Sequence, residues 1–313
     1  MTLTPIGLDI DGSIRQQKEL YSRLTDSADL RAEEKNLRLW ANSQGLKQLR
    51  QTIHSLRQKH PDPWLTFIGS GDLHHITLSL LESLPEKLGP VTFVLIDHHP
   101  DWFTRPPRNH CGNWVSGIPK IKRVQSIILA GQDSDDLKPK NFWSFPFREL
   151  CTGRIQLFPY KRKPIRAFMR WPARVASAEK IVRRFYGTDL YFETLMQSSP
   201  DIFFSNLADR LKGQTLYISI DKDCLEKKSA LTDWEQGQIA LKDLITGINK
   251  LKQVCPVAGV DICGDQAPSP LKGLLQRIDS GRIFPNITTK ESVNSINETT
   301  NLELLDTFLK EPV

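Results

Sequence analysis

Short apolar runs, rich in β-branched and aromatic residues, are the feature that most constrains the fold of this 313-residue chain. Each run ends in polar or glycine-rich residues, which is typical of strands buried on both faces of a sheet. The runs are Trp64–Ile68, Val91–Ile96, Gln125–Ala130, Thr215–Ile220 and Pro256–Ile262, with a weaker one at Ile6–Ile10. Because helical patterns lie between them, we predict an α/β fold whose mostly parallel sheet is covered on both faces.

The helical patterns and the chain length predict how the rest of the chain is organised. Amphipathic periodicity covers 32–56, as one or two helices, and 76–84 and 241–251. The length suits one large α/β domain, predicted over residues 1–285, with a basic insertion near residues 140–210. We predict that residues 286–313 form a loosely structured tail with a short helix near 302–309.

Composition and charge narrow the cellular context and the partners. No apolar stretch approaches the roughly 20 residues of a membrane span, and no secretory signal is visible at the start. Five cysteines without a CxxC pair favour a reducing compartment, so we expect a soluble, cytoplasmic protein. Between Arg154 and Arg174, seven Lys or Arg residues interleave with aromatic residues. Since no nucleic-acid-binding motif accompanies this segment, we expect a small-molecule substrate and no nucleic-acid or membrane partner.

Aspartate and histidine residues directly follow four of the predicted strands. The four segments are Gly69–His75, Asp97–Asp101, Asp221–Asp223 and Cys263–Asp265. In open parallel α/β sheets, ligands bind beyond the carboxyl ends of the strands. A single Asp-x-Asp or His-His pair is more often a turn or a helix cap, but several such clusters after buried strands indicate one shared site.

The spacing within these segments predicts a metal centre. Asp97, His99 and Asp101 alternate, so an extended backbone aims their side chains to one side. Together with two further segments, the candidate donors are His74 or His75, Asp97, His99, Asp101, Asp221 and Asp223. Four carboxylates at short range repel each other unless cations lie between them. An oxygen-rich set with two imidazoles and no thiolate favours two Mn²⁺ ions per chain over structural zinc.

These motifs resemble those of the ureohydrolases, the arginase and agmatinase group. Asp97–Asp101 is similar to their Asp-Ala-His-x-Asp motif and Ser219–Asp223 to Ser-x-Asp-x-Asp, while Gly71–His75 resembles Gly-Gly-Asp-His with one residue inserted. The order and separation also agree from Leu65 to Pro270. The resemblance implies a three-layer α/β/α fold with a binuclear Mn²⁺ centre, and it is compatible with a homo-oligomer.

The resemblance also implies a role for each donor and a reaction. Asp97 and Asp221 would bridge the two ions, His99 and Asp223 would bind one ion, and Asp101 with His74 or His75 would bind the other. A water activated between the ions would attack the carbon of a guanidino, amidine or amide group and cleave its C–N bond.

Further residues are predicted to act on the substrate. The ureohydrolases carry a histidine in a loop just after the metal motif, and the segment Asn109–Trp114 occupies that interval here. His110 is therefore the candidate that protonates the leaving nitrogen, with a surface or capping role as the alternative. Asn109 and Asn113 are candidates for binding polar groups of the substrate.

The sequence departs from the family where the substrate would bind. The glutamate expected three residues after Asp261 is replaced by Gly264, and the adjacent Asp265 is the candidate to take over its role. We therefore predict that free arginine is not the substrate.

Two alternatives remain open. One is a ureohydrolase-like scaffold that has become a binding or regulatory protein. The other is a haloacid-dehalogenase-like phosphatase that uses Asp9 and Asp11, because the segment Gly7–Ser13 resembles the nucleophile motif of that family.

Overall fold

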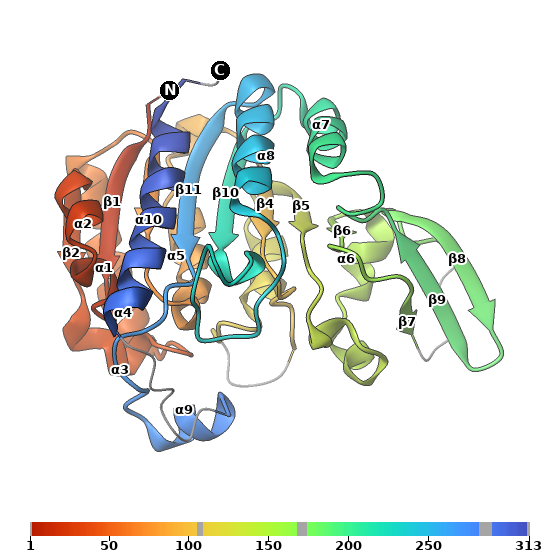
Figure 1. The fold of residues 1–313 in the computed structure, drawn as a ribbon, viewed down its shortest axis with the longest axis horizontal. Coiled ribbons are helices and arrows are strands. Elements are labelled where there is room, and N and C mark those ends of the chain that lie inside the picture. Colours follow the sequence, from red (N-terminus) through yellow and green to blue (C-terminus); the bar gives the residue numbers. More distant parts are fainter. Residues whose placement is uncertain (1, 105–108, 168–173, 282–289, 312–313) are drawn as a thin grey trace.

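The computed structural model describes residues 2–104, 109–167, 174–281 and 290–311. Within these ranges, eight strands form one parallel sheet in the order β2-β1-β3-β11-β10-β4-β5-β6 (Figure 1). The strands are β1 Thr4–Asp9, β2 Asp26–Asp29, β3 Trp64–Phe67, β4 Val91–Ile96, β5 Val124–Ala130, β6 Ile155–Phe158, β10 Leu216–Asp221 and β11 Val257–Cys263. The predicted parallel sheet is confirmed.

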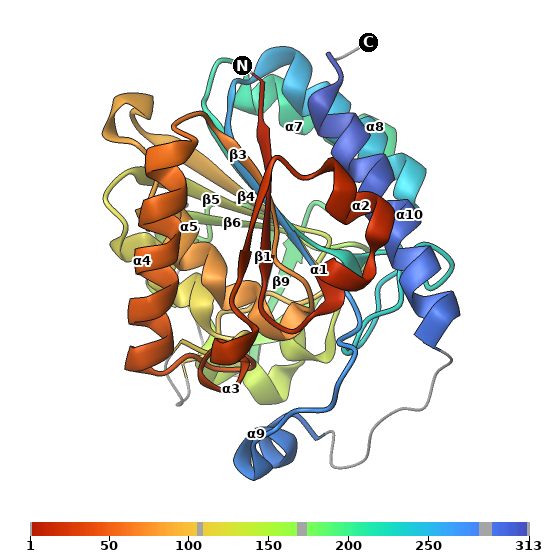
Figure 2. The same ribbon diagram turned by 90° about the vertical axis from the view of Figure 1, so that its left-hand side faces the viewer.

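Helices cover both faces of this sheet (Figure 2). One face carries α4 Ser43–Lys59 and α5 Thr77–Glu82, and the other carries α1 Ser13–Gln16, α2 Lys18–Arg23, α7 Pro200–Leu211, α8 Leu241–Val254 and α10 Lys290–Leu309. Short helices α3 Glu34–Leu37, α6 Phe147–Thr152 and α9 Leu274–Asp279 complete the described set. Helices α4, α7 and α8 each bury an apolar stripe, such as Leu244, Ile248 and Leu251 of α8. The layers are those of an α/β/α fold, and no described helix is long and apolar enough to cross a membrane.

The helical pattern predicted over residues 32–56 forms two helices, α3 and α4. Leu39 adopts a left-handed conformation with φ of 71°, which interrupts the helical path between them. Asn42 then caps α4, because its side-chain oxygen accepts a hydrogen bond from the amide of Gly45 at 2.9 Å.

The prediction of a loosely structured tail is wrong for its described part. Helix α10 is 20 residues long, and it lies beside α8 against the sheet (Figure 1). Its buried side includes the polar residues Asn297, Thr300 and Asn301 as well as Leu304 and Leu305. These polar groups form hydrogen bonds with a loop and with Gln17, which directly follows α1. Because polar residues occupy buried positions, the sequence of α10 shows only a weak apolar periodicity. Residues 286–289 of the predicted tail lie outside the described residues.

The segment predicted as a basic insertion, residues 140–210, contains a small antiparallel sheet beyond β6 (Figure 1). Its strands are β7 Ile165–Ala167, β8 Ala178–Arg184 and β9 Gly187–Phe192, in the order β7-β9-β8. Buried Asp189 accepts hydrogen bonds from Arg166 at 2.6 Å and Arg184 at 2.9 Å. Part of the basic charge is therefore neutralised within this sheet; Phe168, Arg170 and Trp171 lie outside the described residues.

Candidate metal centre

The predicted polar segments meet at the carboxyl edge of the four central strands. Strands β3, β11, β10 and β4 are neighbours in the sheet, and each of the four segments follows one of them. A cavity of about 350 Å³ opens at this edge. Its lining includes Asp97, His99, Asp101, Asp221 and Asp223.

At this edge, carboxylate oxygens and imidazole nitrogens lie as close to one another as the ligands of a single metal ion do. The Nδ1 atom of His74 is 3.2 Å from an oxygen of Asp97, and 3.4 Å from oxygens of both Asp101 and Asp221. His99 Nδ1 is 2.8 Å from Asp223 Oδ2. Among the described residues, three groups offer donor atoms that all lie within 4.8 Å of one another: His74, Asp97 and Asp101; Asp97, His99 and Asp223; His74, Asp221 and Cys263.

A chain of hydrogen bonds fixes the orientation of the His74 ring. Ser219 donates its hydroxyl proton to Asp261 at 2.6 Å, so its oxygen accepts from His74 Nε2 at 2.9 Å. The ring proton is thereby assigned to Nε2, and the lone pair of Nδ1 faces the carboxylates. Asp261 is itself held by Tyr217, which donates to it at 2.7 Å. Such outer partners orient metal-binding histidines in proteins.

His75, the other histidine of this pair, lies outside the three donor groups. Both of its ring nitrogens are buried without a hydrogen-bond partner. Burial lowers the pKa of His75 to about 3, so its ring is neutral. The segment Gly71–Ile76 is a 3₁₀ helix, in which consecutive side chains point about 120° apart. This turn directs His74, and not His75, toward the cluster.

The carboxylates of the cluster are electrostatically unsatisfied. Burial, and then the charges of Asp223 and Asp101, raise the pKa of Asp97 well above its usual range. Burial and the charge of Asp221 raise the pKa of Asp223 to about 6. His74 Nδ1 and Asp97 Oδ2 are both buried and lie 3.2 Å apart, and, against the effect of burial, the neighbouring acidic groups raise the pKa of His74. Divalent cations between these groups would remove the repulsion, so the donor set fits a metal centre.

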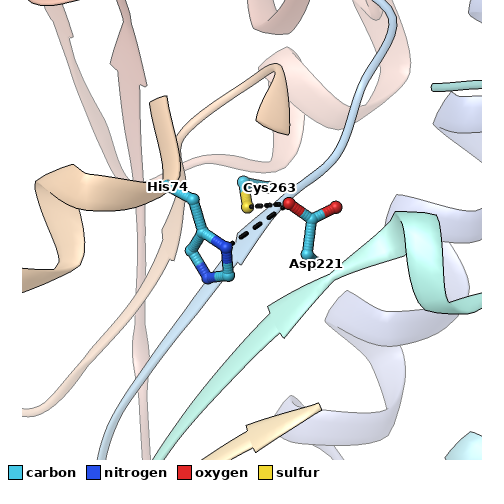
Figure 3. A group of neighbouring side chains, drawn as sticks. All are labelled: His74, Asp221 and Cys263. Atoms are coloured by element: carbon cyan, nitrogen blue, oxygen red, sulfur yellow. Dashed lines mark hydrogen bonds and ion pairs between the residues drawn. The ribbon is translucent and has the colours of Figure 1, made fainter. Parts of the chain in front are cut away.

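Cys263 belongs to this cluster and was not predicted as a donor. It is the last residue of β11, paired in register with Asp221 of β10, and its Sγ lies 3.2 Å from Asp221 Oδ2 (Figure 3). The signal in the sequence was its position directly after a buried strand, two residues beyond Asp261 and therefore on the same side of the strand.

His110 lies in the wall of the cavity with Asn113. Its Nδ1 accepts a hydrogen bond from the amide of Gly112 at 2.9 Å, which assigns the ring proton to Nε2. That Nε2 lies 2.9 Å from a carboxylate oxygen of Asp279 in α9. Asn109, in contrast, has a φ of 57° and its carbonyl oxygen accepts from the amide of Ala41, so it shapes the loop.

Neither Gly264, at the position of the family glutamate, nor Asp265, the candidate to take over its role, presents a carboxylate to the cavity. Gly264 has a φ of 89°, and a Cβ atom there would lie 2.3 Å from Asp221 Oδ1, so no side chain fits. Buried Asp265 instead binds Lys222 and accepts from Asn301 of α10 at 3.3 Å. The sequence alone did not reveal this partner, because Lys222 lies between two candidate metal ligands.

The residues of the phosphatase alternative lie outside the donor groups. Asp9 at the end of β1 forms an ion pair with Arg31 at 3.5 Å. Asp11 accepts hydrogen bonds from Ser13 and from the amide of Ser70 at 3.1 Å, so it fastens the loop after β3. Both carboxylates therefore have structural partners in the described part of the chain.

Comparison with known proteins agrees with this architecture. No protein-family model matches the sequence. An uncharacterized protein of Thermotoga maritima is 23% identical over 208 residues, which is 66% of this chain and 60% of that protein's length. The proclavaminate amidino hydrolase of Streptomyces clavuligerus superposes with a TM-score of 0.59 at 12% identity, over 99% of this chain and 93% of the other.

Two arginases superpose comparably. The Entamoeba histolytica arginase in complex with L-ornithine gives a TM-score of 0.58 at 12% identity, over 99% of both chains. The arginase of Medicago truncatula gives 0.56 at 13% identity, over 98% of this chain and 86% of the other. The chain thus has the ureohydrolase fold, as the motifs at the ends of its central strands predicted.

Proposed function

We propose that this protein is a binuclear metal-dependent hydrolase that cleaves a C–N bond of a guanidino, amidine or amide compound. The observation that carries the proposal is the convergence of three donor groups on one cavity, at the carboxyl edge of a sheet with the ureohydrolase fold. The amidino hydrolase and the arginases that share this fold are named for reactions of that class.

The donor groups suggest how the ions would be shared. Asp97 belongs to two of the groups, which supports the bridging role that the resemblance implies for it, whereas the proposed bridging role of Asp221 rests on the resemblance alone. Two divalent ions, for which an oxygen-rich set favours Mn²⁺, would lower the pKa of a water shared between them and polarise the substrate. Asp223 and Asp97 hold His99 and its backbone in place, through contacts of 2.8 Å and 2.6 Å.

We propose His110 as the group that transfers a proton to the leaving nitrogen. Its Nε2 carries a proton and lies 2.9 Å from a carboxylate oxygen of Asp279, so this nitrogen is the proposed site of proton transfer. Asn113 accepts from the amide of His110 at 2.9 Å and so fixes the loop that carries this ring. In this proposal Asn113 positions His110, and it also lines the cavity where the substrate would bind.

Free arginine is an unsuitable substrate in this proposal, because residues 264 and 265 offer no carboxylate to a guanidinium. The loss of a charge-assisted contact worth roughly 1.5–3 kcal/mol lowers the rate or affinity by about one to two decades. The cavity retains another carboxylate outside the donor groups, Asp136, which follows β5. Burial raises the pKa of Asp136, and a cationic substrate group beside it would favour its ionised form.

Metal content and hydrolysis measured on the same preparations test the proposal. Protein loaded with Mn²⁺ should bind two ions per chain and release urea, ammonia or an amine from one member of a panel of guanidino, amidine and amide compounds. Arginine should react at least about 10-fold more slowly than the preferred compound. Asp97→Asn should lose both ions and all turnover.

A matched variant and two contrary results complete this test. Asp189→Asn, which changes a buried carboxylate of the small sheet, should keep both ions and the activity. Full metal uptake without turnover of any compound would favour the regulatory alternative. Arginine turnover at ordinary enzyme rates would refute the inference about the substrate.

A further inference from the structure

The third donor group differs from the other two because it contains a thiol. His74, Asp221 and Cys263 come from three different segments and converge on one point (Figure 3). We propose that Cys263 Sγ is a ligand of the ion at this point, which makes this position of the centre softer than its neighbour. The inference rests on the metal centre proposed above and specifies the chemistry of one of its two positions.

The distances are those of donors around a common ion. Asp221 Oδ2 lies 3.2 Å from Cys263 Sγ and 3.4 Å from His74 Nδ1. Ligands about 2.0–2.3 Å from an ion, at tetrahedral or octahedral angles, are separated by about 3.0–3.7 Å. All three donor atoms lie within 4.8 Å of one another, so a single ion can reach each of them.

An unsatisfied nitrogen provides independent support. His74 is 1% exposed, and its Nδ1 has no hydrogen-bond partner although it faces the group. Since Ser219 fixes the ring proton on the other nitrogen, Nδ1 directs a lone pair toward negatively charged oxygens. Without an ion, only a second ring proton, on Nδ1, would relieve its contacts with the carboxylates of Asp97, Asp101 and Asp221. A cation bound by all three donors satisfies this nitrogen.

The order of strands also makes the thiol part of the site. Strand β11 lies between β3, which precedes His74, and β10, which ends in Asp221. The last residue of β11 is therefore held between the other two donors. Cys263 is 1% exposed, which shields its sulfur from reagents in solution and keeps it directed at this point.

The two metal positions should consequently prefer different ions. Asp97, His99 and Asp223 form an oxygen-rich group suited to Mn²⁺. A thiolate at the other position favours Zn²⁺ or Co²⁺, and binding there releases the thiol proton to solvent. Because Zn²⁺ binds most nitrogen and oxygen ligands more tightly than Mn²⁺, competition should displace Mn²⁺ from the thiolate position at a lower Zn²⁺ concentration than from the other position.

Cobalt provides a direct readout that does not depend on activity. Titration of the metal-free full-length protein with Co²⁺ should produce a sulfur-to-cobalt charge-transfer band in the near ultraviolet, in addition to the weaker visible bands of cobalt. Cys263→Ser should lose the charge-transfer band and keep the visible bands. The same variant should shift the ratio of bound Zn²⁺ to Mn²⁺ toward Mn²⁺ by at least about 10-fold.

The matched control is Cys255→Ser, which changes another buried cysteine. Cys255 donates to the carbonyl of Leu211 and lies among the residues packed under α8, so this variant should keep the charge-transfer band. Visible cobalt bands without a charge-transfer band in the unmodified protein would overturn the role of Cys263 and leave the metal centre intact. Absence of any cobalt binding would overturn both proposals. The spectrum of the unmodified protein decides these outcomes even if Cys263→Ser does not fold.

Discussion

Buried carboxylates on the two sides of one sheet edge have different partners. On the cavity side, Asp97, Asp221 and Asp223 lie together with no lysine or arginine among the three donor groups of the described chain. On the side of α10, buried Asp265 is bound by Lys222 and by Asn301. Lys222 stands between Asp221 and Asp223 in the sequence, yet its side chain is directed to the other side.

This difference separates a carboxylate paired within the protein from the carboxylates proposed to bind metal. A buried acid with its own lysine is satisfied within the protein, whereas a cluster without one requires a cation from solution. The chain places its nearest lysine where that lysine cannot neutralise the cluster. The repulsion among the cavity carboxylates is therefore part of the proposed metal site, and variants that change one side of the edge should leave the other unchanged.

The largest expected effect is on metal binding. Asp221→Asn should lose both ions, because Asp221 is proposed to bridge them, while the amide oxygen can still accept from the amide of Asp223. Asp265→Asn should keep both ions and lose stability, because Lys222 is then buried without a carboxylate. Elemental analysis would measure the metal content of the two variants, and thermal unfolding would measure their stability. Two ions retained in Asp221→Asn would contradict the bridging role.

The next effect concerns the α10 side alone. Lys222→Met should lower the free energy of unfolding by about 3–5 kcal/mol, because it leaves Asp265 as an uncompensated buried charge. The double variant Lys222→Met/Asp265→Asn should recover most of this loss, since the amide still accepts from Asn301. Denaturant unfolding would test both variants. A double variant no more stable than the single one would argue against the ion pair as the cause.

A smaller effect should follow from loosening His74. Ser219→Ala removes the group that orients the His74 ring, and we expect metal affinity to fall by about 10–100-fold. Ser126→Ala, which changes a hydroxyl on β5 of the same sheet, should leave the affinity unchanged. Competition with a chromophoric chelator would measure both affinities. Equal affinities in the two variants would show that the ring needs no such support.

The last predicted effect is on the pH dependence of the stability of the metal-free protein. The pKa of Asp223 is raised to about 6 in the folded state from 3.8, so folding favours its protonated form. Stability should then be highest below pH ~4 for this group and fall by at most about 3 kcal/mol as pH rises through ~6. Asp223→Asn should remove this decline, and bound metal should abolish it. Urea unfolding across this range, with and without metal, would test the sign; a rise in stability over the same window would contradict it.

The strands were predictable because their signal is local. Val91–Ile96 is buried at every position, so its apolar run appears without interruption in the sequence. The first part of helix α10, before the short helix expected near 302–309, was missed because buried Asn297 and Asn301 break its apolar pattern, and their partners are distant in the chain. Strand β2, Asp26–Asp29, was missed for a related reason: it is a polar edge strand that pairs only with β1.

The sequence by itself determined the fold class, the segments at the ends of the strands and the acidic, imidazole-bearing character of the site, since these depend on local pattern and spacing. The tertiary structure decided which side chains join the cluster. It selected His74 over His75 through a 3₁₀ turn, closed position 264 to any side chain, turned Lys222 toward Asp265, and brought Cys263 in between β3 and β10. The physical reason is that strand order and side-chain direction depend on hydrogen bonds between segments far apart in the chain, which no local periodicity records.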